Sequence, residues 1–371
     1  MANVLGIVNF ENNSVVIEGL SKFRTIPAIS FLGRYRVIDF VLSNFVNSHI
    51  NQIKILIKDK PRSLIEHIGG GTQYNINSKT GSLQILYSDH QIVNRLYFTD
   101  IALIKQYRQY IENNSAEYVV IAPSYMICKI DYQNVIHQHK LNNAEVTCVY
   151  KSVDDADVNF IGCQEVYLSD NGKIDKVKVN HGGIKKKDIS LESYVFSKDT
   201  LLKIIDNATE HSSIYSFKTY FENSAKNIKM YGYKYEGYLS CINSLRSYFE
   251  TSMELIDQQK AKELFAQDWP IYTKTNDSVP AFYSKSAHVK NCLIANGCVV
   301  QGELENCILG RGVKIKKGAR LKNSVILPNA IIGEDSVIEY TVVDKSAKTK
   351  YVKEIIGDAD NILYIKRGDT V

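Results

Sequence analysis

Several classes of protein are excluded by what this sequence lacks. Its 371 residues contain no apolar run of about 18 residues, the length that a membrane-spanning helix requires. The first residues do not show the order of charged, apolar and small residues that is typical of an export signal. We therefore expect a cytoplasmic protein without membrane contact.

Metal-binding and nucleic-acid-binding patterns are also missing. The seven cysteines form no CxxC pair and have no histidine at zinc spacing, so we expect small core side chains and no metal site. The net charge of +5 is mild, and the one basic run, Lys185 to Lys187, is not part of an RNA- or DNA-binding motif. Such a run is more often a solvated loop, and we expect no nucleic-acid partner.

The length and the 44% hydrophobic content are sufficient for two domains. Up to residue 240 the chain alternates short apolar runs with segments that carry apolar residues at helical spacing. This pattern predicts an α/β domain with a mostly parallel sheet over residues 1–240. The strands are expected at "VLGIV", "IKILIK", "EYVVIA" and "AEVTCVYK", and helices at "RVIDFVLSNFVNSHI" and "DIALIKQYRQYIENN".

The pattern changes in the last third of the chain. Residues 241–280 read as a helix followed by a proline-containing linker, and residues 281–371 follow a period of six. This period predicts a left-handed parallel β-helix in which three hexapeptides form each triangular turn. Such a coil has open ends and flat faces, so we expect it to pack in an assembly. The positions in question are Val289, Ala295, Gln301, Cys307, Val313, Ala319, Val325, Ile331, Val337 and Val343.

The loop after the first strand is unusual for a nucleotide-binding domain. In such domains this loop is glycine-rich, because phosphates approach its backbone closely. Here residues 9–14 read "NFENNS", with no glycine before Gly19 and with the carboxylate of Glu11. That carboxylate would repel a polyphosphate, so the loop is poorly suited to phosphate binding.

Two long segments carry a resemblance to a known family. The words "GRYRVIDFVLSN" and "VNSHI" resemble the N-terminal region of glucose-1-phosphate adenylyltransferase, also called ADP-glucose pyrophosphorylase. The stretch from "NCLIANGCVV" to "IEYTVVDK" is similar to the β-helix of that family. The resemblance implies a Rossmann-like, GT-A-like nucleotidyltransferase domain followed by a left-handed β-helix. It also implies a family chemistry in which ATP and glucose 1-phosphate give ADP-glucose and pyrophosphate, with carboxylates that hold Mg²⁺.

The residues that the family uses for this chemistry are replaced here. The glycine loop and its arginine are absent, and Ile26 and Lys58 stand at a family lysine and a family glutamine. Ser124 or Tyr125 falls on the first metal-binding aspartate, and Cys241 on the second. The family's Glu-Lys-Pro motif, with its sugar-phosphate lysine, corresponds to "VNH" at residues 179–181, with Asn180 at the centre. Asp131 matches a later family aspartate, where helix capping is expected.

The resemblance therefore implies a catalytically silent, regulatory subunit, with no catalytic residue, cofactor or metal of its own. The implied partner is the catalytic subunit of the same enzyme, in a hetero-oligomer that the resemblance suggests is a tetramer. Arg24, Arg36 and His67 match positions that bind a regulatory anion in the family, so a phosphorylated effector is a further expectation. In the alternative interpretation, Arg34 and Arg36 are surface charges that flank a core helix and His67 is an ordinary capping residue.

Two enzymatic alternatives remain open. A divergent but active sugar-phosphate nucleotidyltransferase would use Lys176 or Lys178 together with an acid such as Asp131. A β-helix acyltransferase would need a catalytic histidine on the coil, and His288, at its start, is the one histidine in that region.

Overall fold

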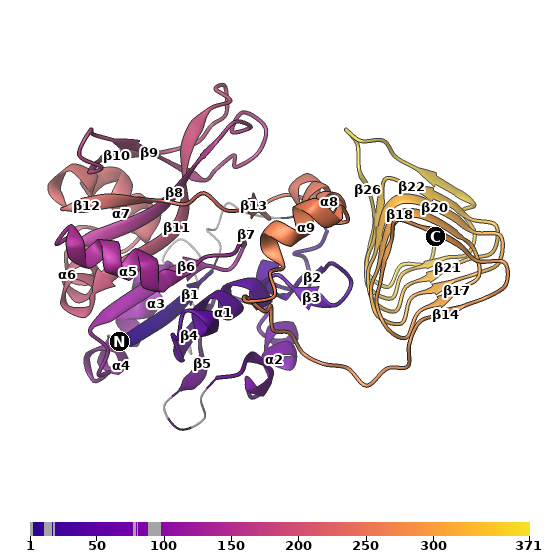
Figure 1. Cartoon of the computed structure of the whole chain (residues 1–371), viewed down its shortest axis with the longest axis horizontal. Coiled ribbons are helices and arrows are strands. Elements are labelled where there is room, and N and C mark those ends of the chain that lie inside the picture. The colour runs from indigo at the N-terminus through magenta and orange to yellow at the C-terminus, as the bar shows by residue number, and fades with distance from the viewer. Residues whose placement is uncertain (1–2, 11–16, 18, 77–78, 80, 88–97) are drawn as a thin grey trace. The chain divides into compact units, whose positions relative to one another are not determined.

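The computed structural model describes residues 3–10, 17, 19–76, 79, 81–87 and 98–371, and the chain forms two compact units (Figure 1). Unit 1 takes its described residues from Met1–Asn12, Phe40–Cys241 and Trp269–Tyr272. Unit 2 takes its described residues from Asn13–Asp39, Ile242–Asp268 and Thr273–Val371. No helix among the described residues is long and apolar enough to span a bilayer.

Unit 1 is built on a nine-stranded sheet. Strands β5, β4, β1 and β6 are parallel neighbours. The apolar runs predict β4, β1 and β6, since strands buried on both faces are continuously hydrophobic, but not β5, most of whose residues are partly or fully exposed. The strands are β1 (Val4–Asn9), β4 (Gln52–Ile57), β5 (Ser82–Tyr87), β6 (Tyr118–Pro123), β8 (Val146–Val153), β9 (Gln164–Leu168), β10 (Ile174–Val179), β11 (Lys187–Ser197) and β12 (Met230–Lys234).

The sheet is mixed rather than mostly parallel, which corrects the sequence-based expectation. Strand β11 runs antiparallel to both β6 and β8, and β9 and β10 form an antiparallel pair. The physical reason is the short connection between β9 and β10, because antiparallel strands can be joined by a tight turn whereas parallel strands need a long crossover. A separate two-stranded ladder joins β7 (Met126–Cys128) to β13 (Leu239–Cys241).

Helices cover the sheet, and side-chain caps fix where most of them begin (Figure 1). Asp131 accepts a hydrogen bond from the Gln133 amide at the start of α5, as the sequence predicts. Ser197 and Ser216 cap α6 and α7 in the same way. The helices of unit 1 are α1 (Ile38–Asn47, which begins in unit 2), α2 (Arg62–Ile68), α3 (Asp100–Gln106), α4 (Arg108–Glu112), α5 (Tyr132–Leu141), α6 (Lys198–His211) and α7 (Phe217–Ser224), with short 3₁₀ turns at Thr72–Tyr74 and Ala225–Asn227.

Unit 2 contains the parallel β-helix, whose stacked turns are visible in Figure 1. Two ladders of parallel strands follow the coil, and Leu304, Leu321 and Ile338 lie in register on successive turns. The coil strands are β14 (Phe282–Tyr283), β15 (His288–Lys290), β16 (Leu293–Ile294), β17 (Val299–Val300), β18 (Glu303–Leu309), β19 (Lys314–Ile315), β20 (Arg320–Ile326), β21 (Ile331–Ile332), β22 (Val337–Glu339), β23 (Thr341–Val343), β24 (Lys348–Thr349), β25 (Glu354–Ile356) and β26 (Leu363–Ile365).

The remaining elements of unit 2 precede the coil in the chain. They pack together through Tyr248, which is buried, contacts Phe31 and donates a hydrogen bond to the Ser30 carbonyl. These elements are a 3₁₀ turn (Ile26–Ala28), β2 (Ser30–Phe31), β3 (Tyr35–Arg36), α8 (Leu245–Glu254) and α9 (Gln258–Leu264).

The turns of the coil are shorter than three hexapeptides. Glu303 pairs with Arg320, and Arg320 pairs with Val337, so each of these turns takes 17 residues. Corners with a positive φ lie at Gly312, Gly318, Asn323, Asn329, Asp335, Tyr340 and Ser346, in steps of six, five and six residues. A left-handed residue at Asn323 and again at Tyr340 turns the chain one residue early. After Asn323 a strict count of six is therefore one residue out: it selects Ile331 and Val337, which are partly buried, whereas their neighbours Ile332 and Ile338 are fully buried.

A buried ion pair ties the start of unit 2 to its coil. The guanidinium of Arg24, whose side chain is 5% exposed, donates to the carboxylate of Asp344, which is fully buried. The hydroxyl of Tyr364 donates to the same carboxylate at 2.7 Å. A buried charge pair of this kind is costly to break, because the remaining partner is left without a counter-charge.

The first prediction concerns this pair. Asp344→Asn should lower the free energy of unfolding by about 3 kcal/mol, measured by urea denaturation, because Arg24 would remain charged and buried. Glu303→Gln is the control, since its partner Arg320 lies 3.9 Å away and both side chains are more than half exposed. An equal loss in the two variants would contradict the assignment.

The second prediction concerns pH. Burial, assisted by Lys140, lowers the pKa of His139 from 6.5 to about 4, and its Nδ1 lies 2.9 Å from the Thr147 hydroxyl. As the pH falls below 6.5, His139 becomes protonated in the unfolded chain, whereas in the folded chain it stays neutral until about pH 4. Stability should therefore fall between these values as the pH falls, by on the order of 1–2 kcal/mol at pH 5 relative to pH 7.

Urea denaturation at pH 7 and pH 5 measures this loss. His139→Gln should remove that part of the pH dependence, whereas His137→Gln, on an exposed position of the same helix, should leave it in place. A loss of equal size in the His139 variant would refute the role of this histidine.

Candidate functional site

The two positions that the resemblance assigns to metal-binding aspartates lie next to each other. Ser124 and Tyr125 follow β6 directly, and the pairing of β7 with β13 sets Cys241 opposite Met126. Ligands of α/β sheets bind outside the carboxyl ends of the strands, which is where Tyr125 stands. All three side chains are buried, and the Ser124 hydroxyl has no hydrogen-bond partner within the described part of the chain.

A bulge in β11 directs a carboxylate to the same place. Between Ser190 and Tyr194 the register of β11 against β8 shifts, and Glu192 lies in this bulge with φ at +52°. Its amide donates to the Ser190 hydroxyl at 2.9 Å. A positive φ costs a residue with a Cβ roughly 1 kcal/mol, and bulges commonly re-aim a side chain at a site.

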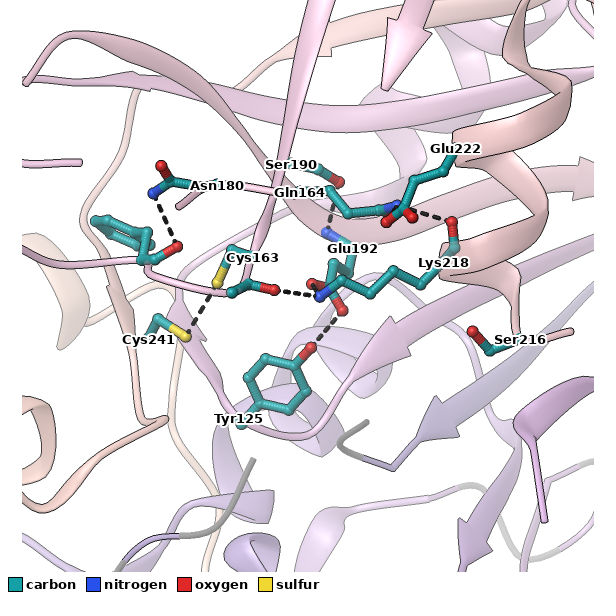
Figure 2. Close-up of polar contacts among 12 residues, drawn as sticks. Tyr125, Cys163, Gln164, Asn180, Ser190, Glu192, Ser216, Lys218, Glu222 and Cys241 are labelled. Atoms are coloured by element: carbon teal, nitrogen blue, oxygen red, sulfur yellow. Dashed lines mark hydrogen bonds and ion pairs between the residues drawn. The ribbon is translucent and has the colours of Figure 1, made fainter. Parts of the chain in front are cut away.

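The Glu192 carboxylate has two internal partners, which Figure 2 shows. Lys218, from α7, places its Nζ 2.9 Å from Glu192 Oε1, and the two side chains are 11% and 13% exposed. The same Nζ donates to the Gly162 carbonyl at 2.6 Å. On the other side, the Tyr125 hydroxyl donates to Glu192 Oε2. We refer to Tyr125, Cys163, Glu192, Lys218 and Cys241 as the Lys218 cluster.

The two thiols of the Lys218 cluster lie close to each other, and an amide, Asn180, lies nearby (Figure 2). Cys163 Sγ lies 3.6 Å from Cys241 Sγ. Asn180, the position matched to the sugar-phosphate lysine, is fully buried and donates to the carbonyls of Ala156 and Phe160 at 2.9 and 3.0 Å. Asn180 thereby holds the loop that carries Gly162 and Cys163, which is a structural role.

The cluster holds one positive and one negative charge. Burial raises the pKa of Tyr125, with Glu192 adding to the effect, so the phenol is neutral. The contact with Cys163, together with burial, raises the pKa of the Cys241 thiol, which is also neutral. Burial is the largest influence and acts to lower the pKa of Lys218, but the Glu192 carboxylate and the other groups around the ammonium together outweigh it, and the pKa is raised. The ammonium is therefore retained.

This donor set does not fit the Mg²⁺ that the family chemistry needs. Magnesium prefers carboxylate, carbonyl and water oxygens, whereas a neutral thiol is a poor ligand for a hard cation. The one carboxylate, Glu192, is already hydrogen-bonded to Tyr125 and paired with Lys218. Among the described residues there is no group of three or more histidine, cysteine, aspartate or glutamate side chains that could hold a metal ion.

The residues that either alternative enzyme would use have other positions or other roles in the structure. Lys176 and Lys178 are exposed on β10; the ammonium of Lys178 stacks on the ring of Tyr167, and the pKa of Lys176 is lowered by Lys178. Asp131 caps α5. His288 is exposed on β15. Of the loop that follows β1, Glu11 to Ser14 lie outside the described residues.

The candidate effector residues are divided between the two units. Arg24 is paired with Asp344, and the amide of Arg36 donates to Asp39 at 2.8 Å, both within unit 2. His67 is buried in the last turn of α2 in unit 1, and its carbonyl accepts from Gln73 at 3.0 Å. An anion could approach the Arg24 guanidinium only in competition with Asp344.

Sequence reasoning missed Glu192, Lys218 and Cys163. Glu192 reads as one polar residue of an alternating strand, and Lys218 as an ordinary lysine near the start of a helix. The available signal was that Tyr125 and Cys241 replace both metal-binding aspartates. Buried polar groups need hydrogen-bond partners, so further polar residues were to be expected around these two positions.

Comparisons with known proteins identify both parts of the chain. A family described as nucleotidyl transferase matches residues 17–257, and one described as GlmU-like, C-terminal hexapeptide, matches residues 279–361. The "Glycogen biosynthesis protein GlgD" of Bacillus subtilis is 31% identical over 365 residues, 98% of this chain and 96% of that protein. The "Glycogen biosynthesis protein GlgD" of Geobacillus stearothermophilus is 32% identical over 85% of this chain and 82% of that protein.

Catalytic relatives are similar to the same degree. The "Glucose-1-phosphate adenylyltransferase" of Fervidobacterium nodosum is 28% identical over 353 residues, 94% of this chain and 85% of that protein. The nucleotidyl transferase match and the near full-length relatives agree with the mixed α/β unit and the parallel β-helix. The chain therefore belongs to the ADP-glucose pyrophosphorylase family.

Proposed function

We propose that this protein is a regulatory, catalytically silent subunit of glucose-1-phosphate adenylyltransferase, which modulates ADP-glucose synthesis for glycogen. The observation that carries the proposal is the Lys218 cluster. Where the family chemistry needs two carboxylates around a divalent metal, this chain has a neutral phenol and a neutral thiol beside an internal ion pair. Losing such an electrostatic framework costs orders of magnitude in rate.

The full-length relatives support a role in the same pathway without requiring catalysis. Two of them carry the name "Glycogen biosynthesis protein GlgD" rather than the name of an enzyme. The partner is then the catalytic adenylyltransferase subunit, in a hetero-oligomer and, as the resemblance suggests, a tetramer. A phosphorylated effector would have to compete with Asp344 for Arg24, and Arg36 and His67 stay separate candidates, each within its own unit.

One observation favours a second candidate, a divergent active enzyme. The "Glucose-1-phosphate adenylyltransferase" of Lachnospira eligens is 33% identical over 297 residues, 78% of this chain and 69% of that protein, which is close to the identity of the two GlgD proteins over a shorter match. Such an enzyme would have to use Lys176 or Lys178, which are exposed on β10, and an acid other than the two replaced aspartates.

The third prediction separates these candidates. Pyrophosphate release from ATP, Mg²⁺ and glucose 1-phosphate is measured with the protein alone, with the catalytic subunit of the same cell alone, and with the two mixed. We expect the protein alone to be slower than its catalytic partner by a factor of about 1,000 or more, since several charged groups are lost together. The mixture should differ from the catalytic subunit alone in its rate or in its effector response.

Turnover by the protein alone at a rate comparable to the partner would favour the divergent enzyme. Lys176→Ala and Lys178→Ala would then locate the activity. An unchanged rate and effector response in the mixture would contradict regulation.

The fourth prediction concerns single restorations. Ser124→Asp or Tyr125→Asp alone should give no pyrophosphate release, because Cys241 still stands at the position of the second aspartate and the glycine loop is still absent. The Tyr125 variant also places a second carboxylate beside Glu192, where two like charges in a buried site repel. The same assay tests this, and measurable turnover in either single variant would show that fewer groups are limiting than we propose.

A further inference from the structure

The position of the Lys218 ammonium raises a question that catalytic loss alone does not answer. Removing two metal-binding carboxylates could leave an apolar or water-filled space. Here the chain instead places a fixed positive charge beside Tyr125, which stands at one of the replaced positions, through their shared partner Glu192. The ammonium also donates to the carbonyl of Gly162, and the next residue, Cys163, has its Sγ 3.6 Å from the Sγ of Cys241 at the other replaced position.

The ammonium and its two partners come from three separate segments. Glu192 is supplied by the bulge of β11, Gly162 by the loop that Asn180 holds, and Lys218 by α7. The Glu192 carboxylate and the Gly162 carbonyl lie 2.9 and 2.6 Å from Lys218 Nζ, and oxygens of these two kinds also bind small hard cations. The backbone at Glu192 adopts a positive φ to provide one of them, which is a local cost.

Burial alone does not distinguish this ion pair from another in the same unit. Lys187 and Glu165 are 2.6 Å apart and 12% and 10% exposed, so the two pairs are matched in burial. Lys187 lies on β11 before the bulge and Glu165 lies on β9, and neither residue has a positive φ. The Lys218 pair differs because Glu192 lies in the strained bulge and accepts a hydrogen bond from Tyr125, which stands at one of the replaced metal positions.

We propose that the ε-ammonium of Lys218 is a built-in substitute for the divalent cation of this fold. It neutralises Glu192, keeps the strands and loop around the replaced positions in place, and closes them to a metal ion. The inference rests on the proposed function, since it explains how the silent site remains folded. It concerns metal binding by this chain alone, so it can fail while regulation of a partner stands, and the reverse also holds.

The fifth prediction uses Cys241→Asp to return a second carboxylate to the cluster. Binding of Mn²⁺ is measured by isothermal titration calorimetry, without nucleotide, for the full-length wild type, C241D and the double variants K218A/C241D and K187A/C241D. The wild type, C241D and K187A/C241D should bind no Mn²⁺ in a saturable manner at this site, because the ammonium occupies it. K218A/C241D should bind one ion at least about tenfold more tightly than C241D, since two carboxylates are then unpaired.

Two results would overturn the proposal. One is Mn²⁺ binding by C241D that equals that of K218A/C241D, which would mean that the ammonium does not exclude the ion. The other is the absence of binding by a folded K218A/C241D, which would mean that the ammonium does not stand in a cation position.

A second measurement decides the matter if K218A/C241D does not fold. The thermal unfolding midpoint of K218A and of K187A is read with and without millimolar MnCl₂. A midpoint that Mn²⁺ raises in K218A and not in K187A supports the proposal. An equal rise in both variants, or no rise in K218A, overturns it.

Discussion

The need for charge balance in a buried space is the constraint on which the candidate site depends. Glu192 and Lys218 are each almost nine-tenths buried, and neither could remain charged there without the other. Their neighbours Tyr125 and Cys241 stay neutral, because burial and the adjacent groups raise both pKa values. The cluster therefore carries no net charge. Removing or adding a charge at one member leaves another member buried without a counter-charge, which costs stability.

Backbone features position the side chains of the Lys218 cluster. The bulge in β11 turns Glu192 inward, and the ladder between β7 and β13 brings the segment after Tyr125 beside Cys241. Asn180 fixes the loop that offers the Gly162 carbonyl to Lys218. These contacts join residues far apart in the chain, so the site is a property of the sheet and its connections rather than of one motif.

The reach of sequence reasoning follows from how local each feature is. Buried strands such as Val4–Asn9 and helices such as Ile38–Asn47 are encoded within about ten residues, and they were predicted near their observed positions. The period of six identified the coil, but the early corners at Asn323 and Tyr340 depend on left-handed residues that a hydrophobic count does not register.

The partners of charged residues were beyond that reach. Arg24 was expected to face an anion from solution, and its counter-charge is Asp344, 320 residues further along. Glu192 and Lys218 are separated by 26 residues and meet only because a bulge interrupts a strand. Polar residues can be assigned to a site from sequence only when their spacing reflects one element, and neither pair meets that condition.

An internal cation has a different consequence for the fold than an apolar replacement would have. Apolar side chains would remove the need for Glu192 to adopt a positive φ, and the bulge of β11 could relax into a regular strand. Because Lys218 still requires Glu192 and Gly162, the local backbone retains the shape of a cation site. On the inference drawn above, one ammonium held by two oxygens fixes the bulge of β11 and the loop at Gly162, whereas the proposed loss of activity comes from the two replaced aspartates and the absent glycine loop.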